Sequence, residues 1–107
     1  MVEELTPGEF TARRAAGESM TLLDVREGWE LEIAPVPSAV LHIPMGEIEQ
    51  RIGELDPKRT TVVICRSGGR SAQVAHYLNT RGFASVYNLA GGILAWSRDL
   101  DPAIPRY

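Results

Sequence analysis

Residues 62–78 of the chain read VVICRSGGRSAQVAHYL and contain its single cysteine, Cys65. The run VVIC is apolar and β-branched, which is typical of a buried strand. From Ser71 onward, small and apolar side chains recur at helical spacing, as at Ala72 and Leu78. A strand that runs through a short glycine-containing loop into a helix is part of a βαβ unit, so this stretch predicts an α/β fold.

The rest of the chain continues the alternation of strands and helices. The predicted strands are residues 20–26, 39–44, 60–65 and 83–89. The predicted helices are residues 6–17, 46–55, 71–82 and 91–100, the first with a capping box at Thr6, Pro7 and Glu9. Residues 27–39 contain Gly28, Pro35 and Pro37 and are predicted to form a loop. This order predicts an open sheet of four or five mostly parallel strands, with helices on both faces.

Length, charge and composition exclude several classes of protein. A chain of 107 residues predicts one domain over 1–107, with a core at about 5–98 and a tail at 99–107. The net charge of −3 and the scattered basic residues argue against nucleic-acid binding. The chain lacks an apolar run near the roughly 18 residues of a membrane span, and its N-terminus lacks the apolar region of a signal peptide. We therefore expect a cytoplasmic protein with neither a nucleic acid nor a membrane as partner.

A lone cysteine is commonly a small core residue, but the neighbours of Cys65 favour a nucleophile. At the carboxyl end of a central parallel strand, Cys65 would face the positive end of the next helix, which stabilises a thiolate. Glycines in the loop would let backbone amides turn inward as an anion-binding nest. The candidate anion-binding residues are Arg66, Ser67, Gly68, Gly69, Arg70 and Ser71. One cysteine and the absence of a Cys/His cluster predict neither a metal nor another cofactor.

Three further residues belong to the predicted surroundings of this loop. Asp24 and Arg26 end the strand at 20–26, so we expect them at the same edge of the sheet as Cys65. Asp24 is predicted to play a supporting structural role, and a solvated charge pair is the alternative. Trp29 is expected to anchor the predicted loop as its apolar side chain, and a place at the rim of the pocket is the alternative.

The motifs CRSGGRS (65–71) and NLAGGILAW (88–96), with LLDVRE (22–27) upstream, resemble those of the rhodanese (sulfurtransferase) family. The resemblance runs from about Leu22 to Trp96, with the motifs in family order. It implies a rhodanese-like sheet flanked by helices and an active Cys65 that carries a sulfane sulfur as a persulfide. The implied sulfur donor is a small anion, either thiosulfate or a low-molecular-weight persulfide. The implied acceptor is an external molecule, either cyanide or a thiol, and protein thiols are included. Arg66 and Arg70 would then hold the oxyanion of the donor.

Two other functions remain open. A non-catalytic rhodanese-like module could bind a partner or sense redox state through Cys65. A cysteine phosphatase or arsenate reductase is disfavoured because the phosphatase signature needs an arginine six positions after the cysteine, where this chain has Ser71 and places Arg70 one position earlier.

One segment departs from the family pattern. Where rhodaneses usually have a GHIPGA-like stretch, this chain has APVPSA (34–39), with Pro35 for the histidine and Ser38 for a glycine. Because proline lacks an amide hydrogen and restricts its neighbour, we expect residues 34–41 to follow a different path.

Overall fold

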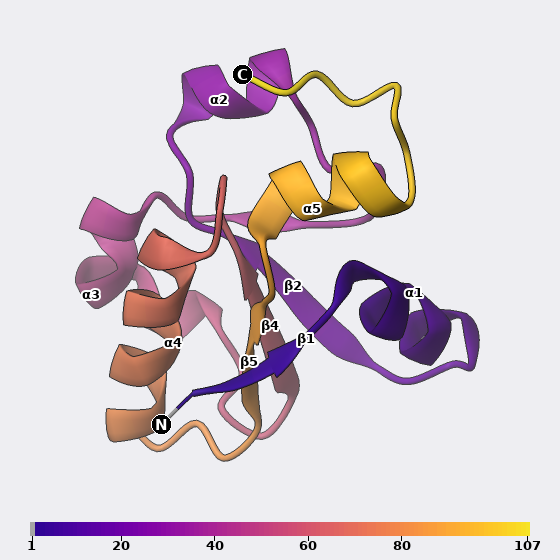
Figure 1. Ribbon diagram of the computed structural model, residues 1–107. Helices are drawn as coiled ribbons and strands as arrows, with labels where there is room; N and C mark the ends of the chain where they lie inside the picture. The colour runs from indigo at the N-terminus through magenta and orange to yellow at the C-terminus, as the bar shows by residue number, and fades with distance from the viewer. Residues whose placement is uncertain (1) are drawn as a thin grey trace.

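A computed structural model describes residues 2–107, in which five parallel strands form one open sheet. The strands lie in the order β1-β5-β4-β2-β3, so β4 is central between β5 and β2, and β1 and β3 are the edges (Figure 1). Their bounds are β1 Glu3–Leu5, β2 Met20–Asp24, β3 Leu41–His42, β4 Thr60–Ile64 and β5 Val86–Leu89. The registry pairs Asp24 of β2 with Ile64 of β4, so both strands end at the same edge. The predicted parallel α/β sheet is confirmed.

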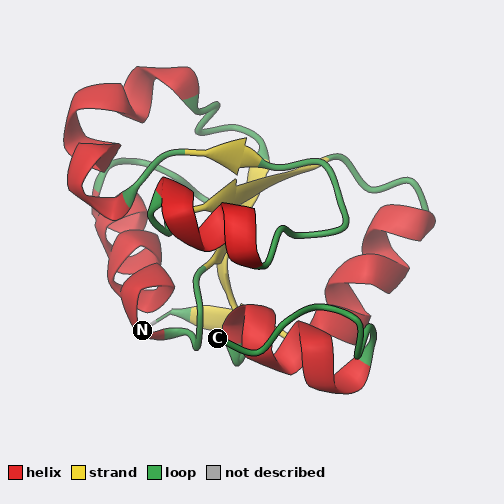
Figure 2. Ribbon diagram, turned by 90° about the horizontal axis from the view of Figure 1, so that it is seen from above, coloured by secondary structure: helices red, strands yellow, loops and turns green. Residues whose placement is uncertain are grey.

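Helices cover both faces of this sheet (Figures 1 and 2). They are α1 Pro7–Ala15, α2 Gly28–Ile33, α3 Ile48–Arg51, α4 Gly69–Thr80 and α5 Gly92–Asp99, with 3₁₀ turns η1 Met45–Glu47 and η2 Ile52–Glu54 on either side of α3. In Figure 1, α3 and α4 lie on one side of the sheet and α1 and α5 on the other. The short helix α2 lies at the top of that view, beside the end of the chain.

Strand β4 shows how the sequence pattern separates the two cores. Val63 and Cys65 pack in the cluster under α3 and α4, and Val62 and Ile64 pack in the cluster under α1 and α5. Successive side chains of a strand point to opposite faces, and a parallel strand buried on both faces is apolar throughout. Trp96 of α5 is buried in the second cluster.

The first helix begins as its capping box predicts. The Glu9 amide donates to Thr6 Oγ1 at 3.1 Å, and the Thr6 amide donates to Glu9 Oε1 at 2.8 Å. Two amides that a helix start leaves without partners are thereby satisfied. Gly17, with a φ of +94°, follows the end of this helix.

Residues 27–39 are not a continuous loop, because they contain helix α2. Gly28 stands at its first position and Pro35 lies beyond its end, so these residues mark the boundaries of a short helix. The Glu27 amide donates to Glu30 Oε2 at 2.8 Å, which caps the first turn. Trp29 and Ile33 are exposed, so α2 lacks the buried apolar stripe by which a helix is recognised.

Several other boundaries differ from the prediction. Strand β1 adds a fifth strand that pairs with β5, and β3 is two residues long because it ends before Pro44. Strand β5 begins at Val86 because the Phe83 amide donates to the Leu78 carbonyl at the end of α4 and is not available to the sheet. Helix α4 begins at Gly69, two residues before the predicted Ser71.

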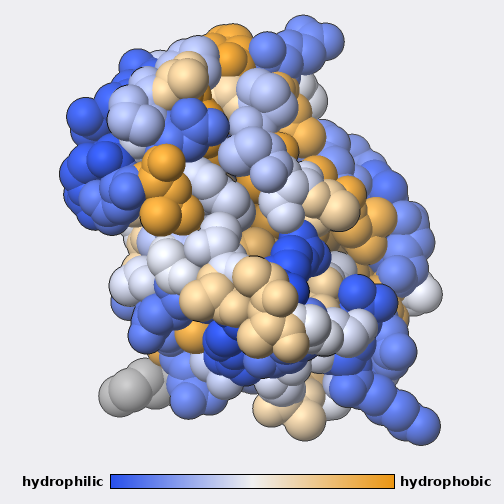
Figure 3. Space-filling view, turned by 90° about the vertical axis from the view of Figure 1, so that its right-hand side faces the viewer, coloured by the Kyte–Doolittle hydropathy of each residue, from blue (hydrophilic) through white to orange (hydrophobic). Residues whose placement is uncertain are grey.

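The surface carries polar and apolar residues side by side. On the face drawn in Figure 3, hydrophilic side chains surround smaller hydrophobic areas. Within residues 2–107, no helix combines the length and the hydropathy needed to cross a membrane.

Candidate active site

Cys65 directly follows β4, at the carboxyl edge of the sheet, where α/β proteins bind their ligands. Its side chain is 1% exposed. The chain then turns through residues 66–68 into α4, so the positive end of this 12-residue helix faces the thiol. The predicted position of Cys65 between strand and helix is therefore the observed one.

Gly68 makes the turn between the cysteine and the helix possible. Its φ of +110° is in the region that favours glycine, and this conformation directs its amide to Cys65 Sγ at 3.1 Å. The φ of Gly69 is not positive, and this residue is the first of α4. The early start of the helix thus follows from the left-handed conformation of Gly68 immediately before it.

Ser71 provides the second hydrogen bond to the thiol. Its Oγ lies 3.2 Å from Cys65 Sγ, and both side chains are buried. Burial raises the pKa of Cys65, but hydrogen bonds from the Ser71 hydroxyl and from the amides of Ser71, Gly68 and Ser67 outweigh it, so the pKa lies below its ordinary value. These contacts favour the thiolate, which is the nucleophilic form of cysteine.

Asn88 on β5 supports this arrangement. The Ser71 hydroxyl lies within hydrogen-bonding distance of both Asn88 Oδ1 and Cys65 Sγ, which are two acceptors for its one proton. Asn88 Nδ2 donates to the Gly68 carbonyl and to Glu4, each at 3.1 Å. One buried amide therefore contacts both residues that hydrogen-bond to the sulfur. Asn88 was not among the residues predicted for the site, although a polar residue within an otherwise apolar strand was an available signal.

The second glycine motif holds the cysteine backbone. The amides of Ile93 and Leu94 at the start of α5 donate to the carbonyl oxygens of Cys65 and Arg66, at 2.9 and 3.1 Å. A Cβ atom on Gly92 would lie 2.5 Å from the Cys65 oxygen, and its φ is +59°. Only glycine fits at this close approach of the turn to the cysteine loop.

Arg70 lies in the first turn of α4 and forms a two-point ion pair with Glu30 of α2. Nη1 and Nη2 of Arg70 each donate to one carboxylate oxygen of Glu30 at 2.7 Å. The hydrogen bonds from Arg70 lower the pKa of Glu30 to about 2 against the opposing effect of burial, with further help from the Glu27 amide and the Tyr107 hydroxyl. Glu30 was missed in the sequence because its segment was predicted to be a loop.

Arg66 points to the end of the described chain. Its guanidinium donates to the main-chain oxygen of Tyr107 and lies 5.2 Å from the centre of the Tyr107 ring. The Tyr107 hydroxyl donates to Glu30 at 2.8 Å, and the ring meets Trp29 edge-on at 6.2 Å. Trp29 is 59% exposed, so it does not anchor α2 by burial. Tyr107 was also missed, because its contacts arise only when the tail folds back over α2.

Asp24 and Arg26 are a buried pair and not a solvated one. Both side chains are 0% exposed, and Arg26 Nη2 lies 2.9 Å from Asp24 Oδ2. Nη2 also donates to the Ala34 carbonyl, Nε donates to Asp24, and Nη1 donates to the Tyr107 hydroxyl. The pair thus connects the end of β2 to the segment after α2 and to the tail, while its contact with the cysteine loop is indirect, through Tyr107.

The structure brings most of the predicted residues to one edge. Cys65, Gly68 and Ser71 contact one another, whereas Arg66 and Arg70 point to Tyr107 and Glu30. Ser67 is exposed, and its amide contributes to the low pKa of Cys65.

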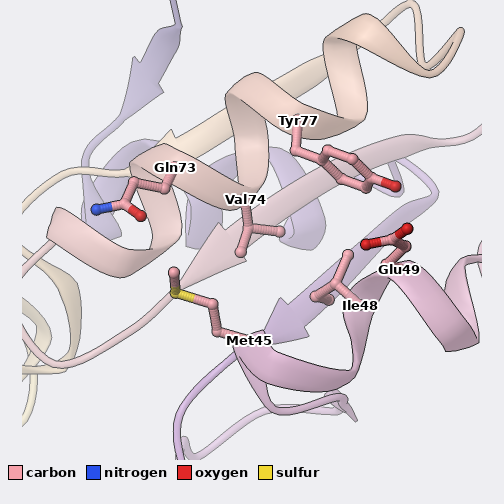
Figure 4. A pocket seen from close by; sticks show the side chains of 6 residues that line it. All are labelled: Met45, Ile48, Glu49, Gln73, Val74 and Tyr77. Atoms are coloured by element: carbon pink, nitrogen blue, oxygen red, sulfur yellow. The ribbon is translucent and has the colours of Figure 1, made fainter.

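A separate groove of about 260 Å³ lies between α4 and the η1–α3 segment (Figure 4). Met45 and Gln73 line one end of it, and Tyr77 and Glu49 face each other at the other end. Its lining contains none of the residues 65–71, so it is distinct from the cysteine loop.

The combination of a parallel open sheet, a cysteine after its central strand and a loop of amides around the thiol defines a rhodanese-like domain. The rhodanese-like domain family matches residues 6–99. The chain therefore belongs to the rhodanese-like family.

Individual relatives agree with this assignment. A sulfurtransferase of Allochromatium vinosum is 40% identical over 98 residues, which cover 92% of this chain and 91% of that protein. The chloroplastic rhodanese-like/PpiC domain-containing protein 12 of Arabidopsis thaliana is 44% identical over 90 residues, and the match spans 80% of this chain but only 30% of that longer protein. A rhodanese-like domain protein of Staphylococcus aureus superimposes with a TM-score of 0.82 at 25% identity, over 99% of both chains.

Proposed function

We propose that this protein is a sulfurtransferase that carries a sulfane sulfur on Cys65 as a persulfide. The observation that carries the proposal is the setting of the Cys65 sulfur, which has the Gly68 amide at 3.1 Å and the Ser71 hydroxyl at 3.2 Å at the start of α4. A persulfide anion needs the same donors as a thiolate. The sulfurtransferase of Allochromatium vinosum supports the same class of reaction.

In the first half-reaction the Cys65 thiolate attacks the outer sulfur of the donor. A bond forms between Sγ and that sulfur, and the sulfur–sulfur bond of the donor breaks. The leaving group is sulfite when the donor is thiosulfate, and the corresponding thiolate when the donor is an organic persulfide, so charge balances in both cases. A general base is unnecessary when the thiol is already ionised, and the lowered pKa of Cys65 supports this.

In the second half-reaction an external acceptor attacks the terminal sulfur of the Cys65 persulfide. When the acceptor is cyanide, the product is thiocyanate, and when it is a thiol, the product is a new persulfide. In each case the electron pair of the broken sulfur–sulfur bond returns to Sγ, which becomes a thiolate again. Because Cys65 is the only cysteine of the chain, it has no second thiol within the chain to accept the sulfur. The acceptor is therefore a separate molecule, including the thiol of another protein.

We assign the supporting roles by position. Amides of loop 66–71 stabilise the persulfide, and Arg66 and Arg70 set the charge that a donor meets. Asp24 and Arg26 act as a structural support behind this loop. A cysteine that stays reduced suits the cytoplasm, where we place the reaction.

The test is persulfide formation on Cys65. Intact-protein mass spectrometry after incubation with thiosulfate or glutathione persulfide should show the addition of one sulfur atom, which cyanide then removes as thiocyanate. Cys65→Ser should show neither the added sulfur nor sulfite release above the uncatalysed rate. A Cys65→Ser protein that still releases sulfite would contradict the mechanism.

The same preparation separates the competing functions. A binding or redox-sensing module would gain no sulfur from either donor, and a phosphatase or arsenate reductase would turn over an aryl phosphate or arsenate without forming a persulfide. Arg70 follows Cys65 by one position fewer than the arginine of the phosphatase signature follows its cysteine, and this shorter spacing supports the sulfur reaction.

A further inference from the structure

The carboxylate of Glu30 is a buried negative charge beside the candidate donor site. It accepts hydrogen bonds from Arg70 on both oxygens, from the Glu27 amide and from the Tyr107 hydroxyl, at distances of 2.7–2.8 Å. The side chain of Glu30 is 4% exposed, against 34% for Arg70. A carboxylate held by four donors is fixed in place, so it is not readily displaced by an incoming anion.

This ion pair changes the charge that a donor meets at the cysteine loop. The two arginines of CRSGGRS would present a charge of +2 if both were free. Glu30 offsets the charge of Arg70 and occupies its two terminal nitrogens, which are the groups suited to two-point recognition of an oxyanion. Arg66 is then the arginine of the loop that has no side-chain carboxylate partner among residues 2–107, and its guanidinium contacts the main-chain oxygen of Tyr107.

We propose that Glu30 makes this site select sulfur donors with a single negative charge, organic persulfides above all, over the thiosulfate dianion. The inference rests on the proposed sulfur transfer through Cys65 and adds the class of donor. A monoanion needs one cation for neutralisation, which Arg66 supplies, whereas a dianion would leave one charge uncompensated beside a fixed carboxylate. The chemistry balances without a further reactant, because the Cys65 thiolate takes the outer sulfur and the donor leaves as its own thiolate.

The neighbouring aromatic side chains suit a donor that carries an organic group. Trp29 is 59% exposed and meets Tyr107 edge-on, and the Tyr107 ring lies 5.2 Å from the Arg66 guanidinium. An apolar surface therefore lies close to the charge of Arg66. The carbon skeleton of a persulfide can pack there, whereas thiosulfate has no carbon to bury.

Two donors that differ by one charge test the role of Glu30. Methanethiosulfonate and thiosulfate both offer an outer sulfur bonded to an oxidised sulfur, but the first is a monoanion and the second a dianion. Their kcat/KM values are measured for the unaltered protein, for Glu30→Gln and for Glu32→Gln, which removes an equal charge from an exposed position of the same helix. Any change in the ionisation of Cys65 affects both donors and cancels in the ratio of the two values.

Glu30→Gln should raise kcat/KM for thiosulfate relative to methanethiosulfonate about tenfold, the order expected for one charge near a partly exposed site. Glu32→Gln should leave the ratio within about twofold. An unchanged ratio in Glu30→Gln, or an equal rise in Glu32→Gln, would overturn the inference while sulfur on Cys65 still upheld the transfer reaction. Failure of both donors to place sulfur on Cys65 would instead defeat the proposed function.

The unaltered protein offers a second measurement that does not depend on the folding of a variant. When Glu30 offsets Arg70, the charges of Arg66 and of the Cys65 thiolate cancel and the loop has no net charge. Added salt should then lower kcat/KM for thiosulfate no more steeply than for methanethiosulfonate. A site with two free arginines would instead attract the dianion more strongly, and salt would weaken that attraction more. A clearly steeper fall for thiosulfate would therefore refute the selection of monoanions.

Discussion

The amide of Ile93 donates to the carbonyl oxygen of Cys65 at 2.9 Å, so the last helix is bound to the residue that carries the candidate nucleophile. Two segments that are almost thirty residues apart in the sequence are therefore in direct backbone contact, with Gly92 at the point of closest approach. The position of the sulfur thus depends on α5 as well as on the loop 66–71 that follows it.

Gly92→Ala should destabilise the protein by about 3 kcal/mol, because a Cβ would lie 2.5 Å from the Cys65 oxygen and the φ of +59° is unfavourable for alanine. Urea unfolding followed by circular dichroism measures this loss. Gly53→Ala is the matched control, since a Cβ there would meet nothing within 4 Å, and its free energy of unfolding should change by less than about 1 kcal/mol. Equal stability of the two variants would show that the close approach is not essential.

Ser71→Ala should raise the pKa of Cys65, because it removes the side-chain hydrogen bond that favours the thiolate and leaves the effect of burial. The rate of alkylation by iodoacetamide, measured against pH, should rise at a higher pH than in the unaltered protein. Thr80→Ala, at the exposed far end of α4, should leave the profile in place. A Ser71→Ala profile that coincides with the original would mean that the amides alone set the ionisation of the thiol.

Asp24→Ala should cost about 3–5 kcal/mol of stability, because the guanidinium of Arg26 would remain buried without its carboxylate. Thermal and urea unfolding both report this loss. Arg98→Ala breaks the exposed pair with Asp99 and should change stability by less than about 1 kcal/mol. A small effect of Asp24→Ala would indicate that water or another acceptor reaches Arg26.

Glu30→Gln should remove part of the acid sensitivity of the protein. The pKa of Glu30 is lowered from 4.5 to about 2 in the folded state, so the ion pair stabilises the protein above pH 4.5 and this contribution disappears as the pH falls towards 2. At pH 6 the free energy of unfolding of the unaltered protein should exceed that of Glu30→Gln by about 2 kcal/mol, after allowance for the 34% exposure of Arg70. Urea unfolding at pH 6, 4 and 2.5 should show this difference narrowing; a difference independent of pH would contradict the assignment.

Much of the site could be predicted from local patterns. The β-branched run before Cys65, the glycine at 68 and the helical spacing after Ser71 each act over a few residues, so sequence alone places the thiol between a strand and a helix. The capping box at Thr6 is local in the same way. These elements are confirmed because their geometry depends on neighbours in the chain.

Helix α2 could not be predicted from the sequence, and the reason is physical. Its exposed Trp29 and Ile33 leave no buried stripe, and its flanking glycine and prolines are residues that also occur in loops. Without that helix, Glu30 had no reason to be placed near Arg70, forty residues away. The two-point ion pair could not be inferred from the sequence, which predicts that Arg66 and Arg70 are both free to bind a donor.

By itself, the sequence predicts the setting of the thiol: a single cysteine, a loop of amides and a parallel sheet that places the thiol at its carboxyl edge. These features follow from residue types and short-range spacing. The folded chain alone reveals the charge of that cradle, because Glu30, Asn88 and Tyr107 reach it from three other segments. Such contacts depend on how the elements pack and not on the order of neighbouring residues.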